Sequence, residues 1–176
     1  MNRKHVTQAL ALIAVCWTVA PLWAERGDDS NRLSKNGKTT ATIDDVDITI
    51  EYGRPSVKDR VIWGGLVPYD RVWRTGADEA TTISFSDDVL IAGQPLAAGE
   101  YSLFTIPGET EWTVIFNNVA EQWGAFNYDE SQDALRITTE PRANDFVETF
   151  EIGVEDSDVE LRWAELLVPF TVSASD

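Results

Sequence analysis

Apolar and polar residues alternate along much of the chain, which is the pattern of half-buried β-strands. Within 46–52 the even positions are apolar and the odd positions are polar or acidic, so we expect a strand with one face against a core. Other segments have strand-like composition and are separated by turn residues: 40–43, 80–86, 89–92, 100–106, 111–117, 134–139, 146–154, 159–163 and 166–172. No segment keeps a 3.6-residue apolar period over three turns.

About nine short strands, with turn signals roughly every 8–12 residues, favour a single all-β domain, an antiparallel β-sandwich or jelly roll. Residues 53–79 are expected to be mostly irregular, because Gly64, Gly65 and Pro68 interrupt them, with one helical turn at 70–73. Residues 118–133 are polar and aromatic without clean periodicity, which predicts a long loop.

The first 24 residues have the composition of a helical signal peptide. A positive start precedes an apolar run from Ala9 to Val19, and the segment ends on the small residue Ala24. The apolar run is shorter than the ~20 residues of a membrane-spanning helix, although a retained anchor stays an alternative. We therefore expect a signal peptide at 1–24, a flexible linker at 25–38 and the β-domain at 39–176. The location would be periplasmic or extracellular.

Cleavage after Ala24 would change the available chemistry, because the only His (His5) and the only Cys (Cys16) lie in the leader. A mature chain without imidazole or thiol excludes Ser-His-Asp and Cys-His catalysis and metal sites built on these ligands. It also excludes disulfides. We expect no metal and no cofactor.

The chain is strongly acidic, with 30 acids against 14 cations and a net charge of −16. The leader holds two of the cations and no acid, so the mature charge is 12 − 30 = −18. Such a charge opposes binding to nucleic acid or to an anionic membrane surface. It says nothing about oligomeric state.

Residues 52–82, here called the cationic segment, contrast with this acidity. Five cations fall within 21 residues that contain only two acids: Arg54, Lys58, Arg60, Arg71 and Arg74. The planar guanidinium groups of these arginines could together bind a carboxylate, phosphate or sulfate, and the ring of Trp63 or Trp73 could stack on the ligand as a wall of the site. The alternative is internal pairing, for example of Arg74 with Asp78 or Glu79.

Aromatic residues in the polar loop 118–133 suggest a second element of a site. Exposed rings at Trp123, Phe126 and Tyr128 could stack on a sugar or could simply anchor the loop. If this loop folds over the cationic segment, the two form one cleft at the end of the sandwich. The candidate ligand-binding residues are Arg54, Lys58, Arg60, Trp73, Arg74, Glu79, Trp123 and Tyr128.

Several blocks resemble a known bacterial family, catalogued as domain of unknown function 2911. They are GRPSVKDR (53–60), GGLVPYDRVWRTGADEATTISFSDDV (64–89), AGEYSLFTIPG (98–108), WTVIFN (112–117) and WGAFNYD (123–129). The resemblance implies an exported, mostly β, single-domain protein, and it implies no reaction, cofactor or catalytic residue. Asp78 stands where the family pattern leads us to expect Asn.

Three functions remain open on the sequence, and whether the protein is an enzyme is not decided. The first is a binding or envelope-associated module for a small anionic or carbohydrate ligand. The second is a hydrolase of extracellular glycans that uses a carboxylate pair such as Asp78 with Glu79, or Asp129 with Glu130. The third is a purely structural or protein-interaction domain.

Overall fold

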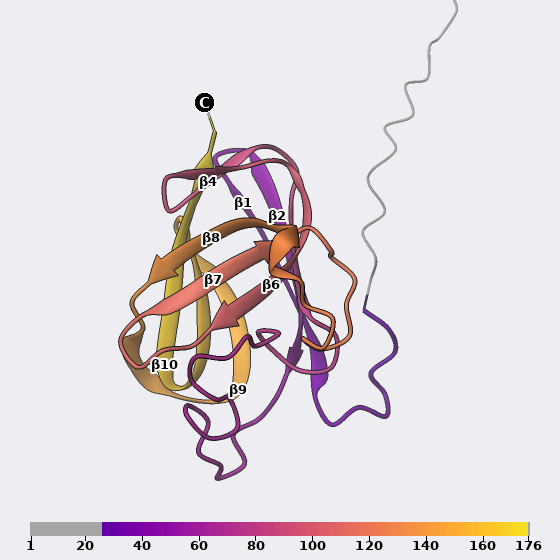
Figure 1. The fold of residues 1–176 in the computed structure, drawn as a ribbon, viewed down its shortest axis with the longest axis vertical. Coiled ribbons are helices and arrows are strands. Elements are labelled where there is room, and N and C mark those ends of the chain that lie inside the picture. Colours follow the sequence, from indigo (N-terminus) through magenta and orange to yellow (C-terminus); the bar gives the residue numbers. More distant parts are fainter. Residues whose placement is uncertain (1–25, 176) are drawn as a thin grey trace, which may run out of the picture.

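The computed structural model describes residues 26–175, and within them the protein is all-β (Figure 1). There is no α-helix in this range, and a 3₁₀ turn, η1 (Glu130–Gln132), lies just before one of the strands. The strands are β1 (Lys35–Ile43), β2 (Val46–Arg54), β3 (Thr81–Phe85), β4 (Val89–Ile91), β5 (Gln94–Leu96), β6 (Gly99–Ile106), β7 (Trp112–Asn117), β8 (Asp133–Thr139), β9 (Arg142–Glu155) and β10 (Asp158–Ala174). The expected signal peptide lies outside the described residues.

The strands form two antiparallel sheets, which confirms the expected all-β class. The first sheet has the order β1-β2-β3-β6-β7-β8, and the second has the order β5-β4-β10-β9. In the first sheet the chain moves to the neighbouring strand at every step, except where the β4–β5 hairpin leaves for the second sheet. The 111–117 segment pairs back on β6 as the sequence predicts, with Phe104 opposite Ile115.

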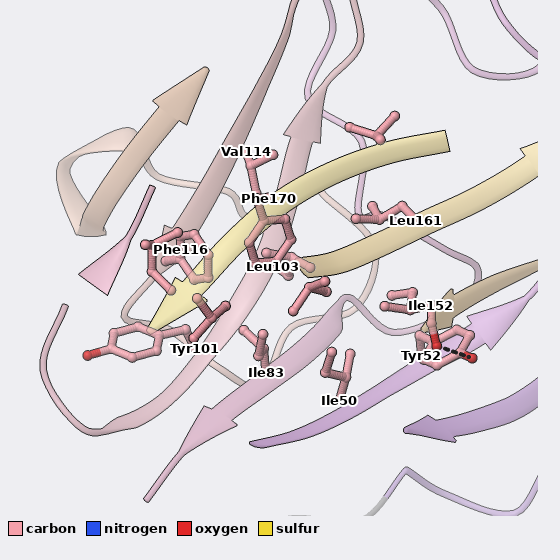
Figure 2. Packing of buried hydrophobic residues seen from close by; sticks show 14 of the residues in the cluster. Ile50, Tyr52, Ile83, Tyr101, Leu103, Val114, Phe116, Ile152, Leu161 and Phe170 are labelled. Atoms are coloured by element: carbon pink, nitrogen blue, oxygen red, sulfur yellow. Dashed lines mark hydrogen bonds between the residues drawn. The ribbon is translucent and has the colours of Figure 1, made fainter. Parts of the chain in front are cut away.

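Both sheets contribute to one hydrophobic core, drawn in Figure 2. Ile50, Ile83 and Leu103 from the first sheet are fully buried in this cluster. Leu161 and Phe170 of β10 belong to the same cluster. The Tyr52 hydroxyl donates to the Ile152 carbonyl (3.3 Å), so this polar group crosses between the sheets without remaining unsatisfied.

The outer face of the first sheet is partly covered by the long loop between β7 and β8. Phe104 and Ile115 point to this side and are fully buried. Tyr128 packs edge-on against Phe104, with ring centroids 5.1 Å apart. The central strands β6 and β7 are therefore buried on both faces, which explains their near-continuous apolar sequence.

Three expectations about the strands need correction. β1 begins at Lys35, inside the segment expected to be a linker, because backbone pairing with β2 needs no apolar alternation. β5 lies between the strands expected at 89–92 and 100–106, where no strand was expected, and it pairs with β4. The two strands expected at 159–163 and 166–172 are one strand, β10, whose pairing with β9 shifts around Ala164, a residue with φ of 51°.

The helical turn expected at 70–73 is also absent. Trp73 instead pairs antiparallel with Thr105 of β6, through hydrogen bonds of 2.7 and 2.9 Å between their backbones. Asp70, with φ of 57°, donates its amide hydrogen to the Pro107 carbonyl (2.9 Å). Pairing with an existing sheet edge satisfies these backbone groups better than an isolated turn would.

Candidate functional site

The cationic segment leaves β2 and first attaches to the second sheet. The Val57 amide donates to the Glu148 carbonyl (2.8 Å), and the Phe150 amide donates to the Pro55 carbonyl (2.9 Å). The segment then loops beyond the ends of the sheets, at the bottom of Figure 1, and returns along β6 through Trp73. Its two ends are thus fixed on different sheets, and the loop spans the end of the core.

A close backbone contact holds the returning part of the segment against β2. A Cβ atom added to Gly53 would lie 2.2 Å from the Ala77 carbonyl oxygen. Beside it, the Thr75 side chain is fully buried and the Thr81 hydroxyl donates to the Thr75 carbonyl (2.6 Å). Glycine is needed at 53 because any side chain would push the two backbones apart.

The segment encloses a hollow of about 370 Å³, here called the basic cleft. Three cations line it, Lys58, Arg60 and Arg74, together with one acid, Asp78. The balance of these four side chains is three positive against one negative charge, in a chain whose net charge is −16. Its apolar lining is Leu33, Pro55, Leu66, Val67, Trp73, Ala77 and Trp163.

Arg74 is the least satisfied cation of the basic cleft. Its Nε atom is buried and has no hydrogen-bond partner among the described residues. None of the ion pairs within 4.0 Å in the described part of the chain involves it. Burial lowers the pKa of Arg74, and the negative charge of nearby Asp78 only partly offsets this effect.

The other cations of the segment differ in how they are held. Arg60 donates through Nε to the Val57 carbonyl (3.0 Å), so backbone oxygens fix its guanidinium without neutralising it. Lys58 is exposed, and its backbone, with φ of 48°, donates to Glu148. Arg54 lies outside the cleft lining: its Nε donates to the Phe150 carbonyl (3.3 Å), and Nη2 is 3.9 Å from Glu151.

Of the two tryptophans expected as a stacking wall, Trp73 lines the basic cleft and Trp63 does not, and both pack in or against the core. Trp73 is 9% exposed and stacks on Trp163 at 6.0 Å between ring centroids. Trp63 packs edge-on against Trp112 at 4.9 Å. Because Trp73 is nearly buried, it leaves little ring surface for a ligand to stack on.

A separate hollow of about 330 Å³, here called the tryptophan hollow, lies beside the start of β3. Its lining residues are Arg26, Gly27, Glu79, Ala80, Thr82, Ala120, Glu121, Gln122 and Trp123. Glu79 accepts from Arg26 Nη2 (2.9 Å) and from both terminal nitrogens of Arg32 (2.5 and 2.6 Å). Burial opposes ionisation of Glu79, but these two guanidinium groups outweigh it and hold its pKa below the ordinary value.

Tyr128 lines neither hollow. Its hydroxyl donates to Asp133 (2.7 Å) and accepts from Arg136 Nη2 (2.8 Å). Burial and the hydrogen bond to Asp133 raise the pKa of Tyr128 to about 12. The residue therefore anchors the loop, the alternative that the sequence left open.

The structure divides the predicted site residues among four places. Lys58, Arg60, Trp73 and Arg74 share the basic cleft, Glu79 and Trp123 line the tryptophan hollow, and Arg54 and Tyr128 lie elsewhere. The aromatic loop shares the tryptophan hollow with the end of the cationic segment, Glu79, Ala80 and Thr82, but not with the cations of that segment, because Lys58, Arg60 and Arg74 line the basic cleft.

Neither predicted carboxylate pair forms an acid–base arrangement. Asp78 and Glu79 are separated between the two hollows, and two arginines occupy the Glu79 oxygens. Asp129 caps η1 by accepting from Ser131, and Glu130 pairs with Arg136 at 2.9 Å. Among residues 26–175 there is also no group of three or more His, Cys, Asp or Glu that could hold a metal ion.

Sequence reasoning missed Arg26 and Arg32, which were assigned to a linker. Arg26 also donates to the carbonyls of Ala77 (2.8 Å) and Ala80 (3.2 Å), and its amide donates to Glu51 (3.1 Å). No apolar periodicity marks residues 26–34, so the pattern that located the strands could not find these contacts.

No helix within residues 26–175 is long and apolar enough to cross a membrane.

Comparison with other proteins agrees with the resemblance seen in the sequence. No curated protein and no solved structure matches the chain. A family model described as a protein of unknown function (DUF2911) matches residues 34–172, which include every described strand except the last two residues of β10. The chain therefore belongs to the DUF2911 family.

Proposed function

We propose that the protein is a binding module for a small organic anion, held in the basic cleft. The observation that carries this proposal is Arg74, a half-buried guanidinium with an unpartnered Nε, in a chain of 30 acids and 14 cations. With acids in such excess, leaving a cation unpaired inside a hollow costs desolvation energy that internal pairing would have avoided. A bound carboxylate, phosphate or sulfate would supply the missing partner.

The lining of the cleft favours an anion that carries an apolar group. Lys58 and Arg60 add positive charge on the same side as Arg74, while Leu66, Val67 and Trp73 supply apolar wall. A volume of about 370 Å³ lies within the usual range for small-molecule sites, roughly 300–1,000 Å³. Small aromatic and short aliphatic carboxylates or phosphate esters fit this description.

We further propose that the protein works outside the cytoplasm, as its leader-like N-terminal sequence suggests. Residues 25–176 contain neither His nor Cys, so oxidation of thiols would not affect them. Glycan hydrolysis finds no support in the arrangement of the two carboxylate pairs considered above.

The test is isothermal titration of the purified protein with inorganic phosphate, sulfate, benzoate, phenyl phosphate and hexanoate at low ionic strength. We expect at least one of these anions to bind, and we expect Arg74→Gln to weaken it by about tenfold or more, since a charge-assisted hydrogen bond is lost. Arg71→Gln is the matched control, because Arg71 is an exposed arginine of the same segment outside the cleft lining.

The proposal fails if none of these anions binds, or if Arg71→Gln weakens binding as much as Arg74→Gln does. The second result would indicate a general response to positive charge. Circular dichroism of both variants checks that the fold is retained.

A further inference from the structure

We propose that the tryptophan hollow is a second, independent binding site, for a pyranose ring of a neutral carbohydrate. This inference does not rest on the basic cleft. It starts from Trp123, whose side chain is 57% exposed although tryptophan is highly buried on average. Trp63, Trp73, Trp112 and Trp163 all pack in or against the core.

The backbone on both sides of Trp123 is held by hydrogen bonds. Glu79 and Trp123 form an antiparallel bridge, and the Ala80 amide donates to the Gln122 carbonyl (2.9 Å). On the other side of Trp123, the Gly124 amide donates to the Asp78 carbonyl (3.0 Å). Because this backbone is already ordered, only the two side-chain torsions of Trp123 lose conformational freedom when a ligand stacks on the ring.

The polar groups around the ring are also fixed before any ligand arrives. Arg26 and Arg32 together occupy both oxygens of Glu79. Arg26 donates in addition to three backbone carbonyls, those of Ala77, Glu79 and Ala80, at 2.8–3.2 Å. Oε2 of Glu79 accepts two of these bonds and Oε1 accepts one, so Oε1 has a further lone pair that can accept from a hydroxyl group.

Charge and shape then select the kind of ligand. The lining charges are Arg26, Glu79 and Glu121, one positive and two negative, so this hollow gives no preference to anions, unlike the basic cleft. Ala80 and Ala120 leave space beside the indole, and about 330 Å³ accommodates one or two small rings. A flat aromatic surface beside planar polar side chains matches a pyranose, which has an apolar C–H face and hydroxyl groups at its edge.

The experiment is a titration of the purified protein with glucose, galactose, N-acetylglucosamine and their β-linked and α-linked disaccharides and tetrasaccharides. Binding is followed by calorimetry and by the indole N–H signals in NMR spectra. We expect one sugar series to bind and to shift the Trp123 signal. Equal affinity for monosaccharide and tetrasaccharide would identify a free sugar as the ligand, and affinity rising with length would identify a glycan.

Three variants locate the site. Trp123→Ala is expected to reduce affinity by about tenfold or more, because it removes the stacking surface. Phe126→Ala is the matched control, since Phe126 is 85% exposed on the same loop but does not line the hollow. Arg74→Gln should leave sugar binding unchanged, because Arg74 lines only the basic cleft.

The inference is overturned if no sugar of the panel binds, or if Trp123→Ala binds sugar as well as the unaltered protein does. It is also overturned if Arg74→Gln abolishes sugar binding and Trp123→Ala does not, because the sugar would then occupy the basic cleft. Because Trp123 is exposed, Trp123→Ala is expected to keep its melting temperature, and this measurement separates lost binding from lost folding.

Discussion

Arg26 and Arg74 carry the same guanidinium group in opposite surroundings. Arg26 is nearly buried, yet it forms an ion pair with Glu79 and donates to several carbonyls. Arg74 lines an open hollow with its Nε atom unpartnered. Burial lowers the pKa of both residues; ion-pair and carbonyl partners offset part of the desolvation of Arg26, whereas Arg74 has, among the described residues, only the nearby charge of Asp78. The contacts of Arg26 are structural, and the unpartnered Nε of Arg74 is the basis for the binding role that we propose for it.

The lowered pKa of Glu79 predicts a specific pH dependence. A carboxylate with a folded pKa below its ordinary value stabilises the fold at neutral pH, and this contribution is lost as the pH falls through the folded pKa. Glu79→Gln should lower the free energy of unfolding at pH 7 by about 1–3 kcal/mol, because Arg26 loses its counterion. Below about pH 4 the difference between variant and unaltered protein should shrink.

Urea unfolding at pH 7, 5 and 3 measures this difference. Glu130→Gln is the control, since Glu130 forms an exposed pair with Arg136 and should cost under about 1 kcal/mol. A Glu79→Gln effect of the same size at all three pH values would contradict the assignment.

At the scale of elements, the contact between β2 and residues 76–77 positions the basic cleft. Gly53 lets the Ala77 carbonyl approach β2, and Gly76, Ala77 and Asp78 then form part of the cleft lining. The geometry of the cleft therefore depends on a strand residue that never touches the cleft.

Gly53→Ala should destabilise the protein by about 2–3 kcal/mol, because the new methyl group would meet the backbone at 2.2 Å and neither chain can move freely. Thermal or urea unfolding measures the loss. Gly153→Ala in β9 is the control, because its nearest neighbour at 3.0 Å is the mobile end of Arg162, and it should cost much less. Equal losses in the two variants would show that strand glycines in general, rather than this contact, matter.

The strands were predictable wherever one face is buried. The alternation in residues 46–52 gave β2 nearly to its ends, and the paired runs around Pro107 gave the β6–β7 hairpin. β1 was placed five residues late, because residues 35–39 pair through the backbone and carry no apolar signal. β10 was divided at Ala164, because an irregularity in a long strand has the same local signature as a turn.

At the scale of the whole molecule, net charge opposes compactness. A charge of −16 produces self-repulsion that salt screens, with a Debye length of about 10 Å at 0.1 M and about 3 Å at 1 M. Raising NaCl from 20 mM to 1 M should therefore increase the melting temperature by a few degrees. Calorimetry checks this, and Arg74→Gln should show the same increase. A loss of the increase in Arg74→Gln would instead indicate chloride bound in the basic cleft.

The candidate site was only partly predictable, because its assembly depends on contacts between distant residues. Lys58, Arg60 and Arg74 are close in sequence, and one loop brings them to one hollow. Glu79 and its partner Arg26 are 53 residues apart in the sequence, and local composition does not predict such a long-range pairing. Asp78 and Glu79 line different hollows across a bend of the backbone, in which Asp78 has a φ of 64°, and the local apolar pattern does not predict such a bend.

The ion pairs of Arg26 and Arg32 with Glu79 determine where the chain can be truncated without loss of contacts. The family match starts at residue 34, so a fragment cut at that boundary would discard both guanidinium groups that clasp Glu79. Glu79 would then lose both of its ion pairs, and the tryptophan hollow would lose Arg26 from its lining. The folded unit of this chain therefore extends at least eight residues before the family match, to Arg26.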